Sequence, residues 1–484
     1  MPATHLSRLG AIALFATTGC SFWFDFEELQ TETTELGQDA STPGNDAAPV
    51  EICTAESCKD TDPCTDDYCD SDGECVHDAK VRIVEDRIFD PLVADEIHQS
   101  TLVASNNTFF VSVFKSDSEV HDTEIYQFTD TATTLGLPTS VDAIELSGIP
   151  EAEAATTTPV SALGMVVAGT SPFQLVGYAA IGDSLSGAAK IARFEFGANL
   201  TVTDARSVTQ VPLYLADRQR HPVVWQLNNN ELRAAWRSAE TGLYLHPGGR
   251  SIIAYADPAT PDMAPGESVL DVAAMTDTAG GAAVLWTNAS GELRAQAEGD
   301  NTSSLLEQCG ASPHTLVSLS TARLGTTDAF WFASFTQVDP ISSEFGIVQC
   351  IPDAGCIKPF TCGSENASVI ADQYSSVFAH TTRQQDPDYV SYFVSVTPSI
   401  VDSTGVLELQ GSIQIDDPEA GASRSLGTVS LGENDTARVP RSPHVAIVAP
   451  DKVVTTWIQA AADGSGDELH VTRHRLCLPE QETL

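Results

Sequence analysis

Short apolar or alternating runs, broken by Gly, Asp, Asn and Ser, fill the chain from about Ile97 to its C-terminus. Alternation over a few residues is typical of half-buried strands, whereas the spacing that marks an amphipathic helix is scarce here. The pattern therefore predicts an all-β fold for this part of the chain.

The runs also form a repeat. GGAAVLWTNASGELRAQAEG in the middle and DKVVTTWIQAAADGSGDELHVTRHRL near the end share an apolar strand with an aromatic residue, a polar turn and a second strand. Seven such units follow one another roughly 50 to 65 residues apart, with aromatics at Phe114, Tyr178, Trp236, Trp286, Phe335, Phe393 and Trp457. Second strands are expected at residues 124–128, 189–196, 242–247, 291–296, 345–350, 405–411 and 467–473, and preceding strands at 221–227, 268–275, 314–320 and 444–450.

Evenly spaced strands without helices between them predict a β-propeller, here with seven blades over residues 81–484. Each blade buries its faces against its neighbours, which provides a core without helices. The ring has to close, and residues 81–89 (VRIVEDRIF) are the expected outer strand of the last blade. This closure would bring the preceding residues beside Cys477.

The N-terminus resembles a bacterial lipoprotein signal. Arg8 gives a positive start, residues 9–18 are an apolar run too short to span a bilayer, and Gly19 precedes Cys20. In such signals the cysteine is acylated, so the resemblance implies lipidation of Cys20 and a membrane anchor. Thr17 departs from the aliphatic residue that the pattern prefers, and an ordinary secretory signal over residues 1–20 is the alternative.

The charge balance narrows the partners. The chain has 67 acidic and 24 basic residues, a formal net charge of -43, which repels nucleic-acid backbones and excludes nucleic acid as a partner. Residues 21–50 are acidic, rich in Thr and interrupted by Pro and Gly. Such a segment cannot bury enough apolar surface to fold, which predicts a disordered tether.

The cysteines indicate an oxidising compartment. Ten of the eleven remain if Cys20 carries lipid, an even number that can pair. Residues 51–80 form a small module that holds five of them, Cys53, Cys58, Cys64, Cys69 and Cys75. Their spacing lacks the Cys-x-x-Cys of structural zinc sites and redox pairs, which favours disulfides. Because five is odd, one is expected to bridge to Cys477, whereas Cys309, Cys350, Cys356 and Cys362 pair among themselves.

Calcium is the only cofactor that the module suggests. Asp70, Asp72 and Gly73 match positions of an EF-hand loop, but Tyr68 and Ala79 stand where its first and last ligands would be. Asp70 and Asp72 are therefore weak calcium candidates, and no other cofactor is expected.

The module also carries a recognisable motif. It consists of Asp62-Pro63-Cys64-Thr65, then Asp67-Tyr68-Cys69-Asp70, then Gly73-Glu74-Cys75-Val76-His77. This resembles the small Cys-rich repeat of secreted myxobacterial proteins, with Asp62 in place of the usual Asn. The resemblance covers only the module, and it implies an envelope or secreted bacterial protein without implying an activity.

Two enzyme motifs compete with the repeat. Gly182-Asp183-Ser184-Leu185 resembles the signature of the Gly-Asp-Ser-Leu hydrolases, which end on Asp-x-x-His, as Asp467-Glu468-Leu469-His470 does. The repeat accounts for both, because the first falls in a polar turn and Asp467 opens a second strand, and the α/β fold of those hydrolases is missing. The segment Ser238-Ala239-Glu240-Thr241-Gly242 is a degraded form of the sialidase Asp-box.

Four histidines stand at the start of preceding strands, namely His98, His221, His314 and His444. In a propeller these strands line the central channel, so the four imidazoles are candidates for binding a metal or an anionic ligand at one mouth. The alternative is that they hydrogen-bond between blades or face solvent.

These features predict a lipid-anchored envelope protein, on the outer membrane or cell surface, with a non-catalytic binding, recognition or scaffolding role. A glycan or a protein is the expected ligand at a propeller face. A secreted hydrolase acting on glycan or ester substrates and a purely structural surface protein are the alternatives.

Overall fold

The computed structural model describes the protein between Cys53 and Cys477 with several gaps, and residues 1–52 and 478–484 lie outside the described part. The chain divides into two compact units, Met1–Ile52 and Cys53–Leu484, and every described residue belongs to the second. The expected signal, the tether and Cys20 therefore lie outside the described residues.

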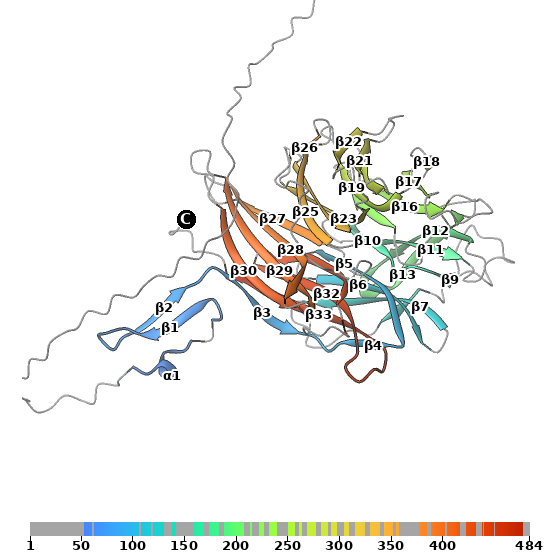
Figure 1. Cartoon of the computed structure of the whole chain (residues 1–484). Coiled ribbons are helices and arrows are strands. Elements are labelled where there is room, and N and C mark those ends of the chain that lie inside the picture. Colours follow the sequence, from blue (N-terminus) through green and yellow to red (C-terminus); the bar gives the residue numbers. More distant parts are fainter. Residues whose placement is uncertain are drawn as a thin grey trace, which may run out of the picture. The chain divides into compact units, whose positions relative to one another are not determined.

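The described part is almost entirely β, which confirms the all-β character expected from the sequence. Its first large sheet has the order β5 (Glu96–Ser105), β6 (Thr108–Asp117), β7 (Val120–Thr129) and β8 (Thr139–Ser140), each strand antiparallel to the next (Figure 1). Three later sheets have the same simple order: β19 (Val269–Thr276), β20 (Ala282–Asn288), β21 (Glu292–Ala297), β22 (Ser304–Gln308); β23 (Thr315–Leu324), β24 (Phe330–Val338), β25 (Ser343–Ile351), β26 (Gly355–Ile357); and β27 (Val377–Gln384), β28 (Tyr389–Val401), β29 (Thr404–Asp416), β30 (Ser423–Leu431).

The second and third units share one ten-stranded sheet, unlike the separate sheets expected. It contains β9 (Thr158–Pro159), β10 (Gly164–Ala168), β11 (Gln174–Gly182), β12 (Ala188–Phe196), β13 (Val202–Ser207), β14 (Leu213–Tyr214), β15 (Val223–Gln226), β16 (Leu232–Ala239), β17 (Arg250–Ala256) and β18 (Pro261–Met263), with the short helix η1 (Ala198–Leu200) before β13. The short β14 joins the two halves, because it pairs with β12 on one side and β16 on the other. A two-residue strand has too little pattern to be seen in a sequence.

The last sheet joins the two ends of the described chain. Its order is β3 (Arg82–Ile88), β33 (Asp467–Cys477), β32 (Lys452–Ala460) and β31 (Arg441–Ala449), and β4 (Leu92–Ala94) also pairs with β33 (Figure 1). The prediction that residues 81–89 supply an outer strand here is confirmed, since Arg82 lies opposite Cys477 in the register.

Six of the seven predicted second strands lie where the pattern puts them, and one prediction was wrong. The partner of β16 is β17 (Arg250–Ala256), not residues 242–247. The sequence offers a reason: Pro247, Gly248 and Gly249 interrupt the chain, and the β-branched Ile252 and Ile253 follow. The two paired strands are therefore farther apart along the chain than the repeat suggests.

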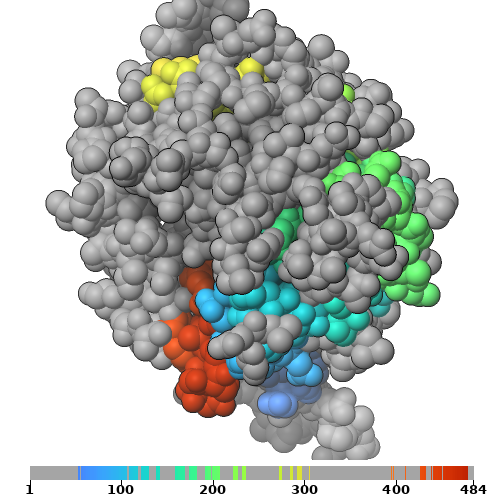
Figure 2. Space-filling model, turned by 90° about the vertical axis from the view of Figure 1, so that its right-hand side faces the viewer, coloured from blue at the N-terminus to red at the C-terminus, as the bar shows by residue number. Residues whose placement is uncertain are grey.

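The first sheet is buried on both faces, which explains the near-continuous apolar run of β6. Phe109, Val111 and Val113 pack against the last sheet, where they meet Val454 and Val471. Phe110 of the same strand points the other way, toward the core of the ten-stranded sheet. Figure 2 shows strands of the last sheet (red) beside those of the first (cyan). Alternate residues of one strand thus fill two cores.

Polar side chains hold the first and second sheets together inside this packing. Thr101 donates a hydrogen bond to the carbonyl of Leu163 at 2.6 Å, and the amide of Leu163 donates one to the hydroxyl of Ser112 at 3.0 Å. The side-chain carbonyl of Gln99 accepts from the amide of Ala162 at 2.9 Å. These bonds satisfy buried backbone groups at the seam. Among the described residues, no helix has the length and apolar character needed to cross a membrane.

Candidate functional site

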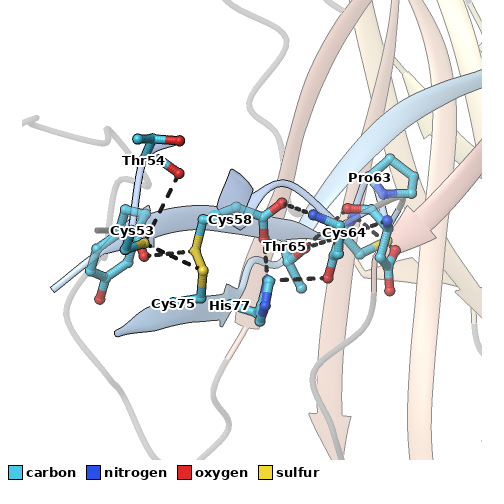
Figure 3. A network of polar contacts seen from close by, with 12 residues as sticks. Cys53, Thr54, Cys58, Pro63, Cys64, Thr65, Cys75 and His77 are labelled. Carbon is cyan, nitrogen blue, oxygen red and sulfur yellow. Dashed lines mark hydrogen bonds and ion pairs between the residues drawn. A yellow bond between two sulfur atoms is a disulfide. The ribbon is translucent and has the colours of Figure 1, made fainter. Parts of the chain in front are cut away.

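Many polar contacts gather in the disulfide module (Figure 3). It consists of helix α1 (Ala55–Cys58) and the hairpin of β1 (Thr65–Cys69) and β2 (Cys75–Ala79) (Figure 3). Thr54 caps the helix, accepting from the amide of Ser57 at 3.1 Å, while the Ser57 hydroxyl accepts from the amide of Thr54 at 2.9 Å. A helix of a single turn depends on this capping box and on its covalent links.

Three disulfides hold the module. They are Cys53–Cys69, Cys58–Cys75 and Cys64–Cys477. The structure thus joins Cys477 to the module, as the odd number of module cysteines predicts, and identifies Cys64 as its partner. Of the other cysteines, the backbone register places Cys350 opposite Cys356 in β25 and β26, whereas Cys309 and Cys362 lie outside the described residues.

Two arginines reinforce the Cys64–Cys477 junction. The Arg82 guanidinium donates to the carbonyl of Pro63 at 2.7 Å and of Thr65 at 3.0 Å, and contacts Asp66 at 2.9 Å. Arg475 Nη1 lies 3.1 Å from Asp62 Oδ1. The carboxylate of Asp62 supplies the negative charge that pairs with Arg475. The sequence could not reveal this pair, because 413 residues separate its members.

The calcium candidates belong to the turn between β1 and β2. Asp70 Oδ1 accepts hydrogen bonds from the amides of Asp72 at 3.0 Å and Glu74 at 2.8 Å, and Gly73 has a φ of 81°. Asp70 therefore stabilises the turn through hydrogen bonds to the backbone, as aspartates commonly do in turns. Neither Asp70 nor Asp72 belongs to a group of three converging ligand-type side chains in the described part, and calcium binding there stays a prediction.

A different cluster forms between Asp60, Asp67 and His77, which sequence reasoning missed. His77 Nδ1 lies 2.7 Å from Asp67 Oδ1 and 3.3 Å from Asp60 Oδ2. The hydrogen bond with Asp67 raises the pKa of His77 above its ordinary value, and the same bond lowers the pKa of Asp67. His77 is the histidine of the Gly-x-Cys-x-His motif, and this was the only signal in the sequence.

Two of the four candidate histidines, His98 and His444, lie in the described part of the chain. His98 Nε2 lies 3.1 Å from Ser116 Oγ, its Nδ1 lies 3.3 Å from Glu96, and its ring is tilted over Phe114 at 5.1 Å. His444 lies in β31, half-buried. His221 and His314 lie outside the described residues, so a shared site stays a prediction.

The hydrolase motif does not assemble a catalytic pair in the described part. Asp467 and His470 both lie in β33, three residues apart, so their side chains point to opposite faces of the sheet. Asp467 accepts a hydrogen bond from the amide of Ile97 at 2.8 Å and pairs with Arg441. The His470 ring stacks on Trp457 at 5.2 Å, and burial lowers its pKa. Gly182 is the last residue of β11 rather than part of the turn that the repeat predicts, and residues 183–187 lie outside the described part.

His474 is a buried histidine that makes stability depend on pH. It is fully buried, hydrogen-bonds Thr455 at 3.0 Å, and burial lowers its pKa to about 4. His474 of the unfolded chain is protonated below about pH 6.5, whereas in the folded chain it stays neutral down to about pH 4. The contribution of neutral His474 to the free energy of unfolding is therefore complete above pH 6.5 and is lost as the pH falls from 6.5 toward 4. We expect urea unfolding to show that protonation of His474 lowers the free energy of unfolding by up to about 3 kcal/mol over this pH range.

The matched variant for this experiment is His474→Gln, which keeps a polar side chain that does not titrate. Carboxylates titrate over the same range in both proteins, so the difference between the two pH curves isolates His474. A difference that stays constant between pH 7 and pH 4.5 would show that burial of His474 does not control its protonation.

No protein-family model and no curated protein sequence matches the chain. Solved structures with some similarity include a Dyadobacter fermentans protein of unknown function, 10% identical with a TM-score of 0.39 over 65% of this chain and 94% of that one. The NanB sialidase of Streptococcus pneumoniae is 10% identical, with a TM-score of 0.39 over 79% and 68%. The polysaccharide lyase Uly1 is 7% identical, with a TM-score of 0.40 over 79% and 90%. Similarities this low support no inference about activity.

Proposed function

We propose that this protein is a lipid-anchored display protein of the bacterial cell envelope, in which a seven-bladed β-propeller carries a non-catalytic binding or scaffolding surface. The observation that carries the proposal is the Cys64–Cys477 bridge, with Arg82 and Arg475 beside it. It ties the module at the start of the described chain to the last strand of the last sheet.

This bridge suits an anchored protein. With a lipid on Cys20 and a tether over residues 21–50, any pull from the membrane reaches the folded part through the module. The disulfide transmits that pull to β33 as well as to β3, so the closing strand is not peeled from its sheet. Persistence of the bridge requires an oxidising compartment, in agreement with an envelope location.

The succession of antiparallel sheets supports the seven-bladed interpretation. In the described part, four sheets each contain one meander of four strands, the last sheet combines the meander β31–β33 with β3, and the ten-stranded sheet contains two meanders, built around β11 and β16. The first sheet shares one apolar core with the last sheet and another with the ten-stranded sheet. A crystal structure of the chain tests the blade number directly.

A binding role fits the chemistry better than a hydrolase role. Asp467 is engaged with Arg441 and the backbone of Ile97, on the face opposite His470. The net charge of -43 favours neutral or cationic ligands over nucleic acid, so an uncharged glycan or a basic protein is the proposed partner.

The experiment has two parts. Cells expressing the chain are labelled with a radioactive fatty acid, and label is expected on the wild type but not on Cys20→Ala. The full chain, purified in mild detergent, is then tested on a glycan array with and without calcium. Specific binding establishes a recognition protein, and its loss on calcium removal revives the metal at Asp70 and Asp72. If the array is blank, a pull-down from envelope extracts follows, and a pull-down that captures no protein leaves a structural role; absence of label on the wild type overturns the anchor.

A further inference from the structure

Three ligand-type side chains of the module converge on one point. Asp60 Oδ2, Asp67 Oδ1 and His77 Nδ1 all lie within 4.8 Å of one another. We propose that Asp60, Asp67 and His77 form a binding site for one divalent transition-metal ion, distinct from the Asp70–Asp72 turn. The ion takes the place of the hydrogen that otherwise lies between the imidazole and the two carboxylates.

The carboxylates are already oriented for this task. Asp67 Oδ2 accepts a hydrogen bond from the amide of Asp60 at 2.8 Å. Asp60 Oδ1 accepts from the amide of Asp62 at 2.7 Å and from the Thr65 hydroxyl at 3.1 Å. Each carboxylate therefore has one oxygen held by the surrounding chain and presents the other to His77. Outer contacts of this kind fix the direction of metal ligands and reduce the ordering needed on binding.

The three ligands come from segments that cannot move apart freely. Asp67 and His77 are directly opposite each other in the β1–β2 register. Asp60 follows α1, whose Cys58 is bonded to Cys75 of β2. The Asp67 side chain is 9% exposed, whereas those of Asp60 and His77 are 36% and 41% exposed. The site is thus rigid at its base and open to solvent, where an ion enters and retains water ligands.

The donor set selects the kind of ion. Calcium and magnesium take oxygen ligands, whereas an imidazole nitrogen suits zinc, copper, iron and nickel. One imidazole and two carboxylates leave a fourth position for water, as in zinc sites that keep an open coordination position. Zinc is therefore the probe, and calcium is the competitor that distinguishes this site from the turn.

The test is calorimetric titration of the full, disulfide-bonded chain with zinc after chelator treatment. The wild type is expected to bind one ion at a site that His77→Ala and Asp67→Asn each weaken by about 10-fold or more. Asp70→Asn is the matched control, because it removes a carboxylate of the same hairpin outside the cluster, and it is expected to leave the affinity unchanged. Peptide mapping of the three disulfides verifies that each variant is correctly folded.

A second measurement avoids substitutions altogether. In the wild-type chain labelled with ¹⁵N in its histidine rings, stoichiometric zinc is expected to shift one Nδ1 resonance, and excess calcium is expected not to reverse the shift. A wild type in which no ring nitrogen responds, equal zinc binding by His77→Ala, or displacement of zinc by calcium would overturn the proposal.

Discussion

Replacing Cys64 and Cys477 together by serine is expected to lower the free energy of unfolding of the full chain by roughly 4–6 kcal/mol. The bridge links residues 413 positions apart, and a cross-link over so long a loop removes much of the freedom of the unfolded chain. It also aligns β3 with β33, since Arg82 lies opposite Cys477 in that pair of strands. Urea unfolding followed by tryptophan fluorescence measures the loss.

The matched control is the pair Cys53 and Cys69, whose bridge spans only 16 residues. The same chain-entropy relation gives roughly 3 kcal/mol for that loop, and its loss is expected to loosen the module rather than the sheets. If the Cys64 and Cys477 double variant loses no more stability than this control, the long bridge stabilises the folded chain no more than the short bridge does.

Much of the fold was predictable because the signals are local. Strand pairs separated by a short turn leave an alternating pattern, which is why β20 and β21, or β32 and β33, are visible in the sequence. The pairing of β3 with β33 was predictable for another reason, because the hypothesis of a ring required a strand from the start of the repeat region to lie beside the last repeat. The bridge to Cys477 followed from parity, a count that needs no geometry.

The rest depends on contacts that no local pattern records. Arg475 and Asp62 meet only because the first and last strands pair. Asp60, Asp67 and His77 converge only once the hairpin register and the disulfides are set. Asp467 and His470 have the Asp-x-x-His spacing of a hydrolase motif, but because both lie in an extended strand their side chains point to opposite faces of the sheet. Spacing predicts chemistry only after the local conformation is known.

The seam between the last and first sheets depends on one carboxylate. Asp467 Oδ2 accepts from the amide of Ile97 at 2.8 Å and from the guanidinium of Arg441, which also donates to the carbonyl of Ile97 at 3.3 Å. Asp467 and Ile97 are buried. Removing the carboxylate leaves the buried amide of Ile97 without its acceptor and the guanidinium of Arg441 without its counter-charge. Both changes strongly destabilise a protein interior.

Asp467→Ala is therefore expected to destabilise the protein by about 3–5 kcal/mol, measured by urea unfolding of the full chain. Glu468→Gln is the matched control, because this neighbouring carboxylate pairs only with the half-buried His470 in the described contacts and its loss is expected to change stability by less than about 1 kcal/mol.

The comparison also separates a structural from a catalytic role for Asp467. A catalytic acid would be replaceable without loss of stability while hydrolysis of an ester or glycan substrate disappears. If Asp467 is structural, Asp467→Ala has a lower free energy of unfolding, and neither the wild type nor the variant hydrolyses the substrate. If Asp467→Ala unfolds at the same urea concentration as the wild type, the seam does not depend on this residue and the hydrolase alternative regains weight.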